Sequence, residues 1–229
     1  MFGHILLVMS VMTSIIPPKE SLVFDVRYGI LKAGKLYLSI KADTFRDVPV
    51  YHITLKLKST KHFGHFFKVD DEIHAYVTRD FHASLRYEKH IREGKYRKDL
   101  IIDYYPDSGL AVYSDGRKFE IPGNVLDPLS VVYLVRDKGI ANIHMQSVNI
   151  HVDGKTSKVT ITVEDSKRIK TPLGKFDAIL VKPNFGDAGF FKGEMKLWLN
   201  TDHTLLPVCI ETKLPIGSIK ARVVEVGLK

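Results

Sequence analysis

The chain has 229 residues, of which 45% are apolar, and this supports one large hydrophobic core. Its formal net charge is +8, and the lysines and arginines are scattered one or two at a time. This pattern indicates no nucleic-acid partner and favours an anionic membrane surface or glycan. Cys209 is the only cysteine, which excludes an internal disulfide and a zinc site built from several cysteines.

The N-terminal residues carry an apolar run, Ile5–Ile16, that is too short to cross a bilayer comfortably as a helix. The run fits the hydrophobic region of a signal peptide, although no Lys or Arg precedes it and no A-x-A site follows. We therefore predict an export segment over residues 1–21, either cleaved or kept as an N-terminal anchor. A buried first strand is the alternative. We expect residues 22–229 to form a single β-rich domain, in an exported protein that is periplasmic or envelope-associated.

Strict alternation of apolar and polar residues dominates the chain after the first 21 residues. It runs through Phe24–Ile30, Lys35–Ala42, Tyr51–Lys58 and Lys158–Val163. A period of two over this many segments predicts half-buried strands, with one face toward a core and the other toward water.

Pairs that end in glycine separate many of these strand-like segments. They are Ala33-Gly34, Glu93-Gly94, Asp115-Gly116 and Asp153-Gly154. A short Gly-containing link between alternating segments is typical of a β-hairpin, and Asp-Gly is an especially strong signal. The pattern predicts an antiparallel meander of about a dozen strands.

Two loops combine glycine with a pair of phenylalanines, Lys61–Lys68 with Phe66–Phe67 and Asn184–Gly193 with Phe190–Phe191. Such loops can close over an apolar ligand or insert into a membrane interface. They can equally pack as plugs on the end of a barrel.

The sequence predicts no catalytic residue, no metal site and no cofactor. His62 and His65 have the spacing H-x-x-H, but on a strand they would point to opposite faces. No H-E-x-x-H, P-loop or G-x-S-x-G motif is present. A protein without enzymatic activity is favoured, while the evenly spread acidic residues leave β-rich lyases and hydrolases open.

One segment, Asn124–Gly139, reads as a helix in a chain of strands. Asp127 can cap it, Pro128 fits its first position and Gly139 can end it. The positions Leu129, Val132, Tyr133 and Arg136 follow at helical spacing. The helix is apolar on nearly every side, so we expect it to be enclosed.

The predicted fold is mainly β, a large antiparallel curled sheet, barrel or half-barrel, that wraps one central helix. A long sheet with one apolar face must curl because strands twist and edges need closing. The helix would cover the apolar face, and such a shape often leaves an apolar cleft beside the helix.

Two further residues have more than one interpretation. Arg136 ends the apolar helix, where it could pair with a carboxylate on a strand or contact a headgroup at the rim of the cleft. Trp198, the only tryptophan, falls on the polar face of its strand. A neighbouring loop could cover it, which we favour, or it could stack on a sugar.

Four blocks of the sequence resemble a bacterial family of exported proteins, the domain of unknown function 3108. They are FDVRYGILKAGKLYLSI at Phe24–Ile40, DPLSVVYLVR at Asp127–Arg136, TPLGKFDAILVKP at Thr171–Pro183 and the segment Phe191–Glu225. The resemblance runs from about Leu22 to the end of the chain. It implies an exported, β-rich envelope protein with no established activity.

The last two blocks are also similar to parts of outer-membrane lipoprotein carriers. The segments are T-P-x-G-x-F and W-x-x-x-D-x-x-x-x-P-V, and those carriers are open β-half-barrels with a helical lid that bind acyl chains. This is a likeness of fold, from which function does not follow. The chain departs from the pattern of the domain of unknown function 3108 family after Asp202. A basic residue usually follows that Asp in the family, whereas this chain has His203 and Thr204.

These observations lead to three functional hypotheses. The first is an envelope protein without enzymatic activity that holds an apolar or amphipathic ligand, such as an acyl chain or lipid, between the sheet and the helix. The second is a polysaccharide-binding or polysaccharide-active protein, and the third is a structural or assembly partner in the envelope. For the first, the candidate ligand-binding residues are Phe66, Phe67, Leu129, Val132, Tyr133, Arg136, Phe190 and Phe191.

Overall fold

The computed structural model describes residues 16–184, 194–214 and 217–228. Within these ranges one sheet contains fifteen strands, and three short α-helices and one 3-10 turn connect them. The strands are β1 Lys19–Tyr28, β2 Leu31–Phe45, β3 Val48–Ser59, β4 Asp70–Thr78, β5 Ser84–Glu93, β6 Tyr96–Tyr105, β7 Leu110–Tyr113, β8 Lys118–Glu120, β9 Val125–Leu126, β10 Ser147–Val152, β11 Lys155–Thr171, β12 Gly174–Asn184, β13 Glu194–Asn200, β14 Pro207–Leu214 and β15 Gly217–Leu228. The helices are α1 Lys61–Gly64, α2 Ser130–Lys138 and α3 Ile140–Ile143, and the 3-10 turn is Pro106–Ser108.

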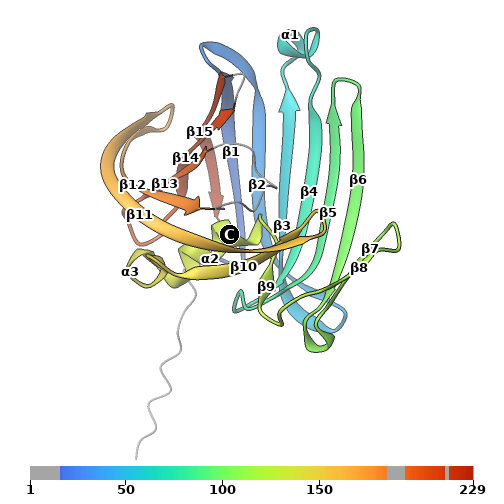
Figure 1. Ribbon diagram of the computed structural model, residues 1–229. Coiled ribbons are helices and arrows are strands. Elements are labelled where there is room, and N and C mark those ends of the chain that lie inside the picture. The colour runs from blue at the N-terminus through green and yellow to red at the C-terminus, as the bar shows by residue number, and fades with distance from the viewer. Residues whose placement is uncertain (1–15, 185–193, 215–216, 229) are drawn as a thin grey trace, which may run out of the picture.

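The strand order places the two ends of the described chain at the middle of the sheet. The order is β8-β7-β6-β5-β4-β3-β2-β1-β15-β14-β13-β12-β11-β10-β9, so β1 pairs with β15 (Figure 1). Every neighbouring pair is antiparallel except β9 and β10, which α2 and α3 connect and which can therefore run in the same direction. The sheet does not close on itself, because β8 and β9 remain as edges.

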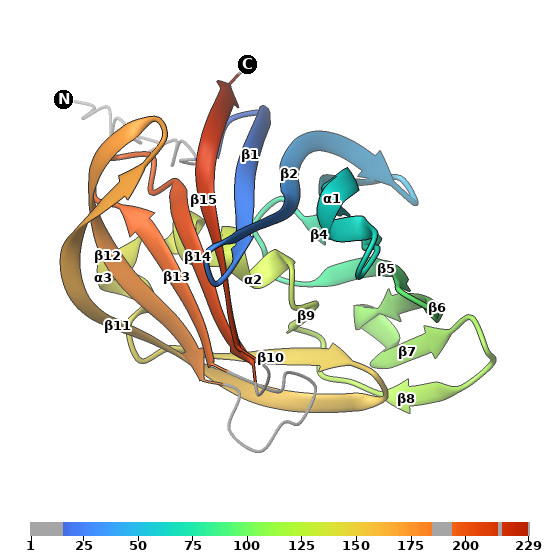
Figure 2. The same ribbon diagram turned by 90° about the horizontal axis from the view of Figure 1, so that it is seen from above.

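Seen from above, the sheet curls around α2 (Figure 2). The face toward the helix, here called the inner face, is apolar, and side chains such as Phe24, Ile53 and Val223 are buried on it. The opposite face is called the outer face. The predicted fold is thus confirmed as an open, curled antiparallel sheet around a central helix. Both edges are short, which limits strand addition by a partner.

Three of the four predicted hairpin turns lie between strands, and the fourth prediction is wrong. Gly94, Gly116 and Gly154 each have a positive φ in a turn between consecutive strands. Gly34 instead lies inside β2, and the turn comes earlier, at Gly29. A Cβ at Gly34 would stand 2.3 Å from the carbonyl oxygen of Lys58, so this glycine serves the close approach of β3.

The longest hairpin, β11–β12, bends away from the curl of the sheet. The register between its strands shifts between Val163 and Ser166, and such a bulge strengthens bending and twist. Its tip at Thr171–Pro172 comes to lie over the outer face of β15 and β1. The hairpin therefore covers part of a face that the alternation alone would leave to solvent.

The folded domain begins before the expected boundary at Leu22. Ile16 is buried in the core, and β1 starts at Lys19. The alternation continues through Glu20, whose side chain lies on the inner face with those of Leu22 and Phe24. Within the described ranges, no helix has the length and apolar character needed to cross a bilayer.

Candidate functional site

The beginning of α2 is fixed by a buried carboxylate. Asp127 accepts hydrogen bonds from the backbone N–H groups of Leu129 (2.8 Å) and Ser130 (2.9 Å), and from the hydroxyls of Ser84 and Ser130 (2.6 Å each). The carboxylate thus caps the helix as predicted, although the regular helix begins at Ser130, after a turn at Pro128 and Leu129. Burial raises the pKa of Asp127, and the four hydrogen bonds oppose this rise.

The end of α2 is fixed by a buried ion pair. Arg136 donates from Nη1 and Nη2 to the two carboxylate oxygens of Glu20, at 2.6 and 2.7 Å, and from Nη2 to the carbonyl oxygen of Thr204 at 3.2 Å. Both side chains of the pair are fully buried. This matches the expected pairing with a strand carboxylate, and the guanidinium does not stand at the rim of a cleft.

Tyr133 lies on the same buried side of the helix as Arg136. Its ring centroid is 5.2 Å from the guanidinium carbon of Arg136. The hydroxyl is buried and has no hydrogen-bond partner among the described residues, and burial raises its pKa. Tyr133 therefore belongs to the packing of the helix against the sheet.

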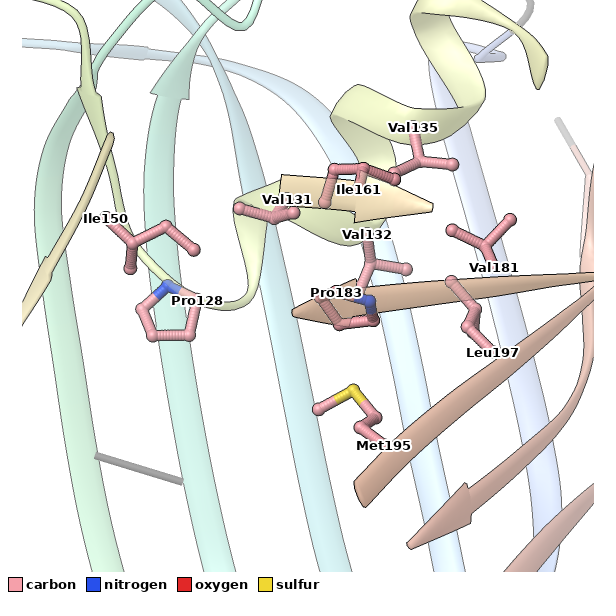
Figure 3. A pocket seen from close by; sticks show the side chains of 10 residues that line it. All are labelled: Pro128, Val131, Val132, Val135, Ile150, Ile161, Val181, Pro183, Met195 and Leu197. Atoms are coloured by element: carbon pink, nitrogen blue, oxygen red, sulfur yellow. The ribbon is translucent and has the colours of Figure 1, made fainter. Parts of the chain in front are cut away.

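A small apolar pocket lies on the other side of α2 (Figure 3). Side chains of the helix face those of four strands across it, and its volume is about 30 Å³. It is lined by Pro128, Val131, Val132, Val135, Ile150, Ile161, Val181, Pro183, Met195 and Leu197. Drug-sized ligand pockets usually measure roughly 300–1,000 Å³, so in this conformation the pocket has room for a small apolar group only.

Among the predicted ligand-binding residues that the structure describes, one lies at this pocket. Val132 lines it, whereas the other predicted helix residues pack elsewhere around α2. Phe66–Phe67 follow α1 and do not line the pocket; Phe66 is 91% exposed, and Phe67 lies against the turn at Gly94. Phe190–Phe191 lie outside the described residues.

The pocket residues on the strands were not predicted as a site. Ile161, Val181 and Leu197 lie on β11, β12 and β13, and the alternation assigns each only to a buried face. Their convergence depends on the register of strands that are far apart in sequence. The sequence indicated only the helix side of the pocket, through the apolar surface of the helix at Val132.

The structure also places the residue behind the sugar-binding hypothesis. Trp198 is 3% exposed, and Lys167 Nζ lies 3.9 Å from its ring centroid, so the indole is covered, although by a side chain of strand β11 and not by a loop. In the ranges that the structure describes, no three His, Cys, Asp or Glu side chains are grouped to hold a metal ion.

Comparisons with known proteins agree with this fold. No curated protein matches the chain in sequence. A crystal structure from Brucella abortus, of a beta-barrel-like protein with the domain of unknown function DUF1849, is similar with a TM-score of 0.66. The match covers 95% of this chain and 99% of that chain at 12% identity, which shows likeness of fold alone. The model of the family described as protein of unknown function (DUF3108) matches residues 23–224, and the chain therefore belongs to that family.

Proposed function

We propose that this protein is an exported cell-envelope protein without enzymatic activity that holds an apolar chain beside helix α2. The observation that carries the proposal is the pocket wall, in which all ten lining side chains that the structure describes are apolar. An apolar recess open to the surface favours an acyl chain or a similar group, because water at such a wall gains no hydrogen bonds.

The size of the pocket limits what it can take in this conformation. A volume of about 30 Å³ suits the end of a chain, so a longer segment requires the pocket to widen. Both ends of α2 are fixed by buried hydrogen bonds, at Asp127 and at Arg136. We therefore infer that widening comes from the strand side, where Met195 can change rotamer at low cost and Pro183 lies near the end of β12.

A bulky side chain in the pocket provides the test. Val132→Trp adds an indole to the pocket from a half-buried position, so we expect the fold to persist and binding of an acyl-chain probe to fall at least about tenfold. Binding is measured by fluorescence of a fatty-acid probe. Native mass spectrometry of the protein purified from its own envelope shows whether a lipid is carried.

The matched control is Val48→Trp, which adds the same indole at an exposed strand position away from the pocket. Equal probe binding by the two variants, together with a protein that carries no lipid from its envelope, would count against an apolar ligand in this pocket.

The export part of the proposal makes a separate prediction. Ile16 is buried and Glu20 holds the ion pair with Arg136, so processing that removed either would cost the domain part of its core. If the N-terminal segment is a cleaved signal, we expect the mature chain to begin at or before Ile16. N-terminal sequencing of protein from the host envelope checks this, and a start after Glu20 would contradict it.

The positive net charge also supports a location in the cell envelope. The scattered lysines and arginines favour an anionic membrane surface or glycan as a neighbour, and this attraction weakens as salt rises.

A further inference from the structure

A second cavity, on the outer face of the sheet, differs in chemistry from the apolar pocket. It lies between the outer face of β1 and β15 and the tip of the β11–β12 hairpin, and its volume is about 340 Å³. It is lined by Asp25, Arg27, Lys170, Thr171, Pro172, Lys220 and Arg222. Four of these seven side chains are cationic and one is a carboxylate, so the wall carries a clear excess of positive charge.

Register explains why these charges gather. Asp25 pairs with Arg222 and Arg27 pairs with Lys220 across β1 and β15, so all four side chains point to one face. The buried residues that alternate with them, such as Val26, point to the inner face. The hairpin tip then adds Lys170 from above and turns an exposed charged surface into a cavity.

Lys220 and Asp25 belong to ion pairs, whereas the other three cations form none with the described residues, and Arg27 donates only to the carbonyl oxygen of Ile30 at 3.2 Å. Lys220 pairs with Glu211 at 2.9 Å, and Asp25 pairs with Lys32 at 3.2 Å. Within the described parts of the chain, neither Arg222 nor Lys170 forms an ion pair. The Nε atom of Arg222 is buried and has no hydrogen-bond partner there.

Three other arginines do have an acidic partner, since Arg46, Arg92 and Arg168 are each paired with an aspartate. A buried N–H donor without an acceptor lowers stability, and four adjacent cations repel one another. An anion in the cavity would relieve both effects at Arg222.

We propose that this outer cavity binds a phosphate group, carried by a soluble phosphate compound or by the headgroup of an anionic phospholipid. Arg222 supplies the central donors from the cavity floor, and Lys170 and Arg27 supply charge from the hairpin tip and from β1. Phosphate fits better than a carboxylate because cations converge from three elements, and tetrahedral oxygens can accept from several directions at once. The proposal does not depend on occupancy of the apolar pocket.

Inorganic phosphate is the first probe, titrated into the full chain by calorimetry at low salt. We expect Arg222→Gln and Lys170→Gln each to reduce affinity, by roughly tenfold or more for Arg222. Asp25→Asn removes the only carboxylate of the wall and should raise affinity. Lys170 is exposed at a hairpin tip, so its substitution tests the cavity without risk to the fold.

The matched control is Arg97→Gln, which removes the same charge from an exposed arginine on β6 that does not line the cavity. We expect it to change phosphate affinity by less than about twofold, since a distant exposed charge is screened. If Arg97→Gln and Arg222→Gln lose phosphate affinity equally, net charge alone explains the effect and the proposal is wrong.

Vesicles separate the two sources of phosphate. Cosedimentation compares vesicles of phosphatidylcholine with the same vesicles containing phosphatidylglycerol. Binding that needs phosphatidylglycerol and Arg222 assigns the cavity to a lipid headgroup, whereas binding of inorganic phosphate alone assigns it to a soluble compound. If the wild type binds neither probe, or if Arg222→Gln and Lys170→Gln both bind as the wild type does, the proposal is wrong.

Discussion

Strand β1 presents one carboxylate to each face of the sheet, and the two have different partners. On the inner face, Glu20 accepts two hydrogen bonds from the guanidinium of Arg136, at 2.6 and 2.7 Å. On the outer face, Asp25 stands opposite Arg222 in register, yet its closest cation is Lys32 at 3.2 Å. Arg222 forms no ion pair with the described residues. The charge of the inner arginine is thus balanced by a carboxylate within the fold, whereas no described carboxylate pairs with the outer one, although the Nε atom of each is buried without a hydrogen-bond partner.

Access to water explains the difference. Glu20 and Arg136 are fully buried, so no solvent could compensate either charge if the other were absent. The outer cavity is open, and hydration there can stabilise a cation that no carboxylate holds. An arginine beside a carboxylate-bearing strand can therefore serve the fold or remain available for recognition, depending on which face it occupies.

The largest expected effect is on the inner pair. Arg136→Met leaves Glu20 buried without its cation, and removal of one partner of a buried ion pair typically costs about 3–5 kcal/mol. We expect the free energy of unfolding to fall by this amount, or the carboxyl group to be protonated in the folded state. Urea unfolding followed by circular dichroism measures the loss.

The control is the double variant Glu20→Leu with Arg136→Met. It replaces both charges with apolar groups of similar size, so it should recover most of the lost stability. If Arg136→Met alone unfolds like the wild type, the ion pair is not a structural element, and the alternative of a ligand contact at Arg136 regains support.

The contrast between the two arginines also shows what sequence reasoning could find. The capping Asp127, the helical spacing through Arg136 and the alternation of the strands are local patterns, and the helix and curled sheet followed from them. The partner of Arg136 lies 116 residues away in sequence, at Glu20. No local pattern assigns that pair, and the export-segment prediction even placed Glu20 outside the domain.

The outer face was harder to predict for the same reason. Alternation correctly placed Trp198 on the outer face, but it did not indicate that Lys167 and the β11–β12 hairpin would cover the indole. The gathering of cations around Arg222 depends on the register of β1 with β15 and on the bulge that bends the hairpin. The sequence predicts a turn at Ala33-Gly34, but Gly34 lies inside a strand and allows the backbone of β3 to approach closely.

Two histidines link stability to pH. His151 contacts Tyr113 and Thr156 at 2.9 and 2.8 Å, and burial lowers its pKa to about 4. On the outer face, burial first and the neighbouring charge of His74 second lower the pKa of His52 to about 4. Both histidines therefore stay neutral in the folded state at a pH where an unfolded histidine is protonated.

The sign of the effect follows from proton binding. Between the unfolded pKa near 6.5 and the folded value of about 4, the unfolded chain binds more protons, so stability falls as the pH is lowered. At about pH 5.5 the expected loss is about 1 kcal/mol for each histidine, relative to neutral pH. Urea unfolding at neutral pH and at about pH 5.5 measures this loss of stability. We expect a smaller loss in His151→Gln and in His52→Gln than in the wild type. An unchanged loss in His52→Gln would mean that the outer histidine titrates normally in the folded protein.

The smallest expected effect is on the outer arginine. Without added phosphate, Arg222→Gln removes one of several neighbouring cations and breaks no ion pair among the described residues, so we expect the free energy of unfolding to change by less than about 0.5 kcal/mol. Less repulsion from Lys220 and relief of the unpartnered Nε favour the variant, while lost packing of the arginine stem opposes it. The same urea experiment that reports on Arg136→Met measures this difference at low salt. A loss approaching that of Arg136→Met would mean that Arg222 is held by the fold, and the contrast between the two faces would then fail.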